Sequence, residues 1–147
     1  MAQAIEDFDV VIVGGGIVGL SAACVLAPIV GRIALVNKIP APEWSAESDY
    51  SLRVSAINLA SQKLLTEIGI WDEIQQMRCT PYHDMVVWQG LADAEVHFSA
   101  NMTRHHSLGT IVENTVLLQA LSQRVQTLAN VSRYEPSSMQ NFSELSD

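Results

Sequence analysis

The stretch FDVVIVGGGIVGLSAACVLA, residues 8–27, decides the fold of this chain. Residues 8–13 form a short, nearly all-apolar run rich in β-branched side chains, which is typical of a parallel strand buried on both faces. After three glycines, residues 17–27 are rich in alanine and leucine and predict a helix. A second apolar run, residues 33–36, predicts the next strand. Together these segments predict a β-α-β unit over residues 8–37, about 30 residues, which is the usual size of such a unit.

The glycines between the first strand and the helix have the spacing of a dinucleotide-binding loop. Gly14, Gly16 and Gly19 form a G-x-G-x-x-G pattern directly after a predicted strand and directly before a predicted helix. Gly14 permits the tight turn, Gly16 lets the backbone approach a pyrophosphate, and Gly19 lets helix and strand pack closely. The helix N-terminus, which begins at Ile17, offers unpaired N–H groups and a partial positive charge. In this frame the pattern predicts a dinucleotide site; the alternative is a tight glycine turn without a ligand.

The end of the second strand departs from the usual dinucleotide site. An Asp or Glu that binds the ribose hydroxyls is expected about 20 residues after the loop, but this chain has Asn37 followed by Lys38. Asn37 can accept one hydrogen bond, without the strength that a charge adds. Considered locally, the pair favours NADP, because no carboxylate there repels a 2′-phosphate. A surface asparagine without a ligand is the alternative.

The rest of the chain alternates between helical and strand patterns, without an internal repeat. Residues 38–52 carry prolines and serines and predict a loop. Asn114 stands at the start of an apolar stripe of helical spacing and is predicted to be its N-cap. The further elements predicted are helices over 58–68, 70–77 and 114–128 and strands over 85–88, 95–98, 110–112 and 131–134.

Size and composition limit the classes of function. A chain of 147 residues that is 48% hydrophobic forms one domain, or one domain and part of another. A formal net charge of −8, with the acids spread along the chain, argues against a nucleic-acid partner, which needs a basic face. Cys24 and Cys79 lie far apart and predict a reducing compartment and no metal site. The N-terminus lacks the basic region of a secretory signal, so we expect a cytoplasmic protein.

The histidines have simple structural interpretations. The pair His105-His106 invites a metal site, but adjacent strand residues point to opposite faces and no carboxylate or cysteine lies at ligand spacing. We therefore interpret the pair as solvated loop residues. His83 and His97 fall in or beside predicted strands, at positions that suit solvent-facing side chains.

Three longer stretches resemble the N-terminal part of the ubiquinone-biosynthesis flavin hydroxylases, which are FAD-dependent aromatic monooxygenases of the para-hydroxybenzoate hydroxylase fold. The stretches are DVVIVGGGIVGLSAA at 9–23, RVSAINLASQKLLTEIGIWDEIQQMRCTPYHDMVVW at 53–88 and GTIVENTVLLQAL at 109–121. The R-x-S-A-I phrase and the helix after it make the resemblance far more specific than the glycine loop alone. MRCTPYHDMVVW looks most like the branch that hydroxylates a methoxylated octaprenyl benzoquinol.

The resemblance implies an α/β fold, namely the N-terminal part of a Rossmann-like FAD-binding domain with part of an inserted substrate region. The insertion is expected to start within about residues 80–110, and a helix and strand return over about residues 114–135. The loop is expected to bind the ADP half of FAD, with NAD(P)H as a transient reductant. Arg53 matches the family arginine that lies against the flavin nucleotide, and its alternative is a solvated arginine. Asn114 matches a helix-start position that contacts the cofactor in relatives, and its alternative is an ordinary N-cap.

The expected function follows from the same resemblance. It is the FAD-binding portion of an enzyme that hydroxylates a polyprenylated quinol or phenol in ubiquinone biosynthesis, inactive as this fragment and with its catalytic residues unknown. Expected partners are the polyprenylated aromatic substrate, other ubiquinone-biosynthesis proteins and the inner membrane as a peripheral surface. An open edge on the first strand predicts self-association. Two other classes stay open, a stand-alone NAD(P)-binding module and a non-catalytic remnant or interaction domain.

Overall fold

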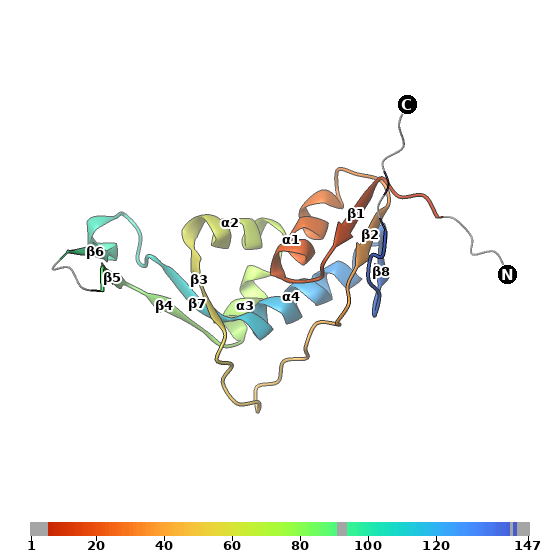
Figure 1. Cartoon of the computed structure of the whole chain (residues 1–147). Helices are drawn as coiled ribbons and strands as arrows, with labels where there is room; N and C mark the ends of the chain where they lie inside the picture. The colour runs from red at the N-terminus through yellow and green to blue at the C-terminus, as the bar shows by residue number, and fades with distance from the viewer. Residues whose placement is uncertain (1–5, 91–93, 142, 144–147) are drawn as a thin grey trace. The chain divides into compact units, whose positions relative to one another are not determined.

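The computed structural model describes residues 6–90, 94–141 and 143 (Figure 1). The chain divides into two compact units, residues 1–44 with 118–147 and residues 45–117. The strands are β1 (Val10–Val13), β2 (Ile33–Val36), β3 (Val54–Asn58), β4 (Cys79–Tyr82), β5 (Asp84–Trp88), β6 (Glu95–Ser99), β7 (Gly109–Glu113) and β8 (Val131–Tyr134). The helices are α1 (Ile17–Leu26), α2 (Leu59–Glu67), α3 (Trp71–Gln76) and α4 (Asn114–Gln126), with a 3-10 turn η1 (Ala100–Met102).

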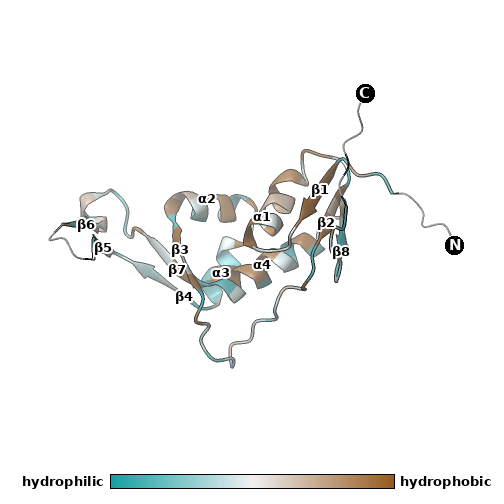
Figure 2. Ribbon diagram, in the orientation of Figure 1, coloured by the Kyte–Doolittle hydropathy of each residue, from teal (hydrophilic) through white to brown (hydrophobic). Residues whose placement is uncertain are grey.

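The first unit contains a three-stranded parallel sheet in the order β1-β2-β8 (Figure 1). This confirms the predicted β-α-β unit and the strand expected at 131–134. The central strand β2 is the most deeply buried, because Ile33, Ala34 and Leu35 have at most 3% of their surface exposed. Its neighbours differ in chemistry: β1 is strongly hydrophobic, whereas β8 is largely hydrophilic (Figure 2). Burial on both faces explains the apolar run of β2. The same burial is expected for β1 from the sequence and is not found, because β1 lies at the edge of the sheet and exposes Val11 and Val13.

Helix α1 packs on the first two strands of this sheet. Its buried side chains are Leu20, Ala23 and Cys24. Small residues on this face let the helix lie close to the strands. The helix begins at Ile17, as the sequence predicts.

The second unit is built around β7, which pairs antiparallel with β3 on one side and with β4 on the other. β5 and β6 form a separate antiparallel pair, at the two segments that the sequence predicts as strands. Helix α2 is capped by Asn58, whose side-chain oxygen accepts a hydrogen bond from the Ser61 N–H at 2.8 Å. Ile70 and Ile74, with 1% and 0% of their surface exposed, anchor α3 in the core of this unit.

Strands β3 and β4 are absent from the sequence prediction. β3 covers the phrase VSAIN directly before α2, and its alternation is too short to stand out from the helical pattern that follows. β4 contains Pro81, which disfavours a strand except at an edge, and β4 is indeed an edge strand of its sheet. Both strands exist because they pair with β7, a partner that lies far away in sequence.

The expected self-association stays a prediction, for which light scattering at micromolar concentration is the measurement. β1 forms an edge of its sheet, and its Val11 and Val13 are 56% and 54% exposed. Open apolar edges recruit other chains. Among the residues that the structure describes, no helix is long and apolar enough to cross a membrane.

Gly19 leads to the first prediction, because a side chain has no room there. A Cβ at Gly19 would lie 1.8 Å from the Gly14 carbonyl oxygen, so helix and loop must separate to admit it. Gly→Ala in a helix interior ordinarily stabilises by about 1 kcal/mol, whereas we expect Gly19→Ala to lower the free energy of unfolding by about 2 kcal/mol, as overpacking does. Urea unfolding measures the difference.

Gly90→Ala is the matched control, because a Cβ at Gly90 would meet nothing within 4 Å and its φ is not positive. We expect its unfolding midpoint to stay close to that of the original chain. A Gly19→Ala chain as stable as the original would contradict the close approach of α1 to the loop.

Candidate functional site

The glycine loop joins β1 to α1 in the first unit. Gly14 adopts a φ of +115°, a conformation that side chains disfavour, and its N–H donates to the Val36 carbonyl oxygen at 2.8 Å. This turn ends β1 and aims the chain into the helix. Gly16 is the N-cap of α1, with extended backbone. The structure thus confirms the turn and packing functions that the spacing predicts for Gly14 and Gly19.

The N-terminus of α1 has the properties of an anion site. No side chain caps it, and its first turn carries no acidic residue. The first described bond within the helix runs from the Leu20 N–H to the Gly16 carbonyl oxygen at 2.9 Å, which leaves the N–H groups of Ile17 and the next two residues for a ligand. A Cβ at Gly16 would meet nothing within 4 Å. A phosphate can therefore approach the backbone here, at the positive end of the helix dipole.

Asn37 lies beside this loop, at the carboxyl end of β2. A Cβ added at Gly15 would come within 2.4 Å of its Nδ2 atom, so the amide side chain covers the loop backbone. Nδ2 donates to the Ile39 carbonyl oxygen at 2.5 Å, and the Asn37 N–H donates to the Tyr134 carbonyl oxygen at 3.0 Å. Lys38, the next residue, is exposed. The predicted positions 37 and 38 thus lie at the same edge of the sheet as the glycine loop.

A carboxylate that the sequence reasoning missed also lies at this edge. Glu135 directly follows β8, and its Oε1 lies 3.5 Å from Asn37 Nδ2. Its Oε2 accepts a hydrogen bond from Arg133 Nη2 at 3.0 Å. The sequence does predict the strand at 131–134, and parallel strands end at the same edge of a sheet. This placement indicates that Glu135, the residue after that strand, lies near the glycine loop.

The other two predicted site residues meet in the second unit. Arg53 precedes β3, and its carbonyl oxygen accepts a hydrogen bond from the Asn114 N–H at 3.0 Å. The Arg53 side chain is exposed. Asn114 is the first residue of α4 rather than a residue before it, and its Oδ1 accepts a hydrogen bond from Ser55 Oγ at 2.6 Å. The structure therefore places Arg53 and Asn114 together at the start of α4.

A buried ion pair holds the loop that leads to Arg53. Arg78 Nη1 lies 3.6 Å from Glu113 Oε1, with only 19% and 6% of the two side chains exposed. Glu113 Oε2 accepts a hydrogen bond from the Ser51 N–H at 3.0 Å. Arg78 Nη2 donates to the Ala46 and Ser48 carbonyl oxygens, and its guanidinium lies 4.5 Å from the centre of the Tyr50 ring. The pair fixes the segment directly before Arg53.

Neither cysteine has the environment of a reactive thiol. Burial raises the pKa of Cys24, and the positive charge of Arg124 offsets part of this rise. Burial also raises the pKa of Cys79. A raised pKa leaves less thiolate at neutral pH, so neither thiol is suited to act as a nucleophile.

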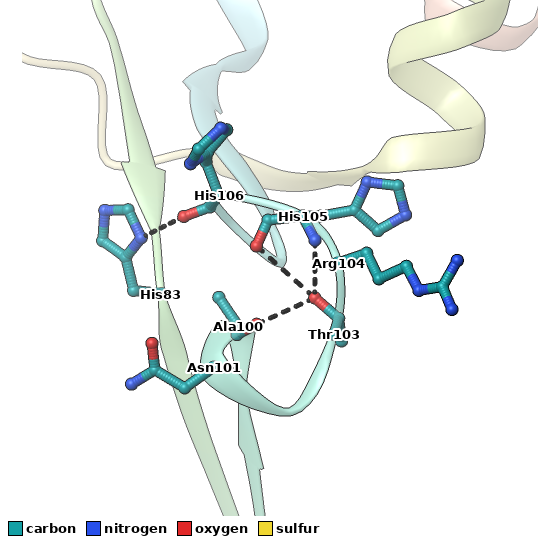
Figure 3. A pocket seen from close by; sticks show the side chains of 7 residues that line it. All are labelled: His83, Ala100, Asn101, Thr103, Arg104, His105 and His106. Atoms are coloured by element: carbon teal, nitrogen blue, oxygen red, sulfur yellow. Dashed lines mark hydrogen bonds between the residues drawn. The ribbon is translucent and has the colours of Figure 1, made fainter.

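His83, His105 and His106 line a hollow in the second unit (Figure 3). His83 Nδ1 lies 2.7 Å from the His106 carbonyl oxygen, and since a carbonyl only accepts, Nδ1 carries the proton. The rings of His105 and His106 point in different directions, and both residues are exposed (Figure 3). Within the described ranges, no cluster of three or more His, Cys, Asp or Glu side chains could hold a metal ion. The hollow is lined by His83, Ala100, Asn101, Thr103, Arg104, His105 and His106.

Comparison with known families identifies the cofactor of this domain. Residues 7–144 match the model of a family described as FAD binding domain. The chain belongs to this family. The match confirms the FAD-binding domain that the resemblance implies. FAD is therefore the cofactor, in place of the NADP that Asn37 and Lys38 favoured locally.

Relatives with known names support the same resemblance. The mitochondrial ubiquinone biosynthesis monooxygenase COQ6 of Danio rerio is 36% identical over 137 residues, which cover 85% of this chain and 27% of the relative. The 3-demethoxyubiquinol 3-hydroxylase of Escherichia coli (strain K12) is 37% identical over 134 residues, or 91% of this chain and 34% of the relative. The chain therefore spans between about a quarter and a third of the length of these relatives.

Solved structures show the fold. The Diels-Alderase PyrE3 has a TM-score of 0.68 at 20% identity, over 92% of this chain and 27% of its own. The p-nitrophenol 4-monooxygenase PnpA of Pseudomonas putida DLL-E4 has a TM-score of 0.59 at 22% identity, over 86% of this chain and 31% of its own. The fold is thus the FAD-binding fold of such flavin monooxygenases. The open backbone at Gly16 and the uncapped start of α1 fit the pyrophosphate of this cofactor.

The Arg78–Glu113 pair leads to the second prediction. Glu113→Gln keeps the shape of the side chain but removes the charge that faces Arg78, whose guanidinium stays buried. We expect the free energy of unfolding to fall by about 2 kcal/mol, as hydrogen bonds to charged groups typically contribute. Urea unfolding at neutral pH measures this loss.

Glu67→Gln is the control, because Glu67 pairs with Lys63 at the surface, with 60% of the Glu67 side chain exposed. An exposed pair of this kind contributes at most about 0.5 kcal/mol. Equal stability losses in the two variants would show that the Arg78–Glu113 pair does not hold the loop.

Proposed function

We propose that this chain is the FAD-binding portion of a flavin-dependent monooxygenase that hydroxylates a polyprenylated quinol or phenol in ubiquinone biosynthesis. The observation that carries the proposal is the glycine loop, which presents open backbone at Gly16 and unpaired N–H groups at Ile17 and the next two residues. The relatives named above, at 36% and 37% identity, are both named for reactions on ubiquinone or its precursors. Their names support the substrate class.

In this proposal, the residues of the chain bind and orient the cofactor, and FAD supplies the redox and oxygen chemistry when it is bound. The backbone of Gly14 to Gly19 and the start of α1 hold the pyrophosphate. The exposed guanidinium of Arg53 has the donors and charge to bind a phosphate of the nucleotide. Asn114 orients the backbone of Arg53 through its N–H.

The proposal extends to the surroundings of the enzyme. A polyprenylated substrate resides in lipid, so the enzyme works at the surface of the inner membrane, from the cytoplasmic side and together with other ubiquinone-biosynthesis proteins. NAD(P)H serves as the transient reductant. Co-sedimentation with lipid vesicles measures the membrane part of the proposal, and a chain that stays in the supernatant would contradict it.

The third prediction tests cofactor binding with a variant that leaves the fold intact. Gly16→Asp places a carboxylate at the N-cap of α1, where extended backbone and open space accept it. Asp is a favoured N-cap residue, so helix stability should not fall. Its charge would face the pyrophosphate, and we expect FAD affinity to drop about tenfold or more. Titration of FAD followed by flavin fluorescence measures the dissociation constants.

Gly16→Asn is the matched control, since it has the same shape and capping ability without the charge. We expect it to bind FAD more tightly than Gly16→Asp. A chain that binds NADPH well and FAD poorly would instead favour the stand-alone NAD(P)-binding module. Equal FAD affinity in the original chain and both variants would place the cofactor away from this loop.

The fourth prediction concerns turnover by these 147 residues alone. The chain spans 27% and 34% of the two relatives, and flavin oxygen chemistry needs a site from which water is excluded. We expect the purified chain, supplied with FAD, NADPH and a prenylated quinol, to form no hydroxylated product detectable by mass spectrometry. Formation of that product would contradict the expectation that these 147 residues alone are inactive.

A further inference from the structure

The carboxyl end of β2 lacks an acid of its own, but a carboxylate from another strand lies beside it. Glu135 Oε1 is 3.5 Å from Asn37 Nδ2, and the Asn37 side chain in turn covers the backbone of the glycine loop at Gly15. The three residues therefore form a continuous row along one edge of the sheet. The row ends in a negative charge that position 37 itself does not provide.

The backbone fixes this arrangement. β2 and β8 are parallel, with Val36 opposite Tyr134, so the residues that follow the two strands emerge side by side. The Asn37 N–H donates to the Tyr134 carbonyl oxygen at 3.0 Å, and the Ser137 N–H donates to the Asn37 carbonyl oxygen at 2.8 Å. Glu135 lies between these two bonds in sequence. Its position next to Asn37 is therefore set by the sheet and not by a flexible tail.

The two oxygens of Glu135 differ in their contacts. Oε2 is held by Arg133 Nη2 at 3.0 Å, and only 11% of the Glu135 side chain is exposed. Oε1 has a described contact only to Asn37 Nδ2, at 3.5 Å, which is longer than a normal N–H···O hydrogen bond. Nδ2 already donates to the Ile39 carbonyl oxygen at 2.5 Å. Oε1 thus retains the capacity to accept hydrogen bonds from a ligand.

We propose that Glu135 supplies the carboxylate that accepts hydrogen bonds from the adenosine ribose hydroxyls of the bound dinucleotide, in place of the acid that β2 lacks at position 37. This inference rests on the proposed function, because it requires a dinucleotide in the glycine loop. It deepens that function by adding a residue that selects the ligand. A carboxylate here repels a 2′-phosphate, so the site prefers an unphosphorylated ribose, as in FAD, over that of NADPH.

The test uses the ADP portion alone, with isothermal titration calorimetry on the full chain. The ligands are ADP, 2′-deoxy-ADP and ADP that carries a 2′-phosphate. For the original chain we expect ADP to bind about tenfold more tightly than either analogue, the difference that one hydrogen bond to a charged group makes. This arm needs no variant, and equal affinity for all three ligands would overturn the inference.

Glu135→Gln is the decisive variant. We expect it to bind ADP about tenfold more weakly than the original chain and to lose most of the discrimination against both analogues. Glu67→Gln removes one exposed charge elsewhere and should keep the affinity and the discrimination. If Glu135→Gln unfolds, the comparison of ADP with its two analogues on the original chain still tests the inference, because equal affinity for the three ligands would overturn it.

The outcomes separate the inference from the proposed function. If the original chain binds neither FAD nor ADP, the proposed function fails and the inference fails with it. If the original chain binds FAD and ADP, but Glu135→Gln keeps the same affinity and the same discrimination, only the inference fails. A variant that binds the 2′-phosphate analogue better than the original chain does would support Glu135 as the source of the repulsion.

Discussion

The site in the first unit depends on one close approach, between the backbone of α1 at Gly19 and the carbonyl oxygen of Gly14. A Cβ at Gly19 would lie 1.8 Å from that oxygen, so the helix can start directly behind the strand only because no side chain intervenes. The positive φ of Gly14 turns the chain at the same point. Together they set the N-terminus of α1 at the carboxyl end of β1, where its free N–H groups and dipole can act on an anion.

The parallel sheet then brings to this edge residues that are far apart in sequence. The Gly14 N–H donates a hydrogen bond to the last residue of β2, and the Asn37 N–H donates one to the last residue of β8. The residue that follows each strand is thus tied to the end of the neighbouring strand. This places Glu135 beside Asn37, although 98 residues separate them. The end of β8 thus places a carboxylate at this edge of the sheet, although the end of β2 carries none. The geometry requires only that the two strands keep their register.

The second unit positions its polar residues in a different way. Glu113, at the end of β7, is almost fully buried and binds both Arg78 and the Ser51 N–H. Removing a charged pair from water costs free energy, which other contacts must offset. Arg78 makes such contacts with two backbone carbonyl oxygens and with the Tyr50 ring. The result is a fixed path for the loop before Arg53, whose carbonyl oxygen is bonded to Asn114.

The sequence by itself determined the β-α-β unit, the strand at 131–134, the glycine loop and the FAD-binding family. These features depend on local patterns, such as apolar runs, glycine spacing and helix caps, which are visible along the chain. Only the tertiary structure revealed β3, β4, the Arg78–Glu113 pair and the place of Glu135 beside Asn37. Each of these features depends on a partner far away in sequence. A local sequence pattern does not show which distant residues will pair in a sheet or form a buried ion pair.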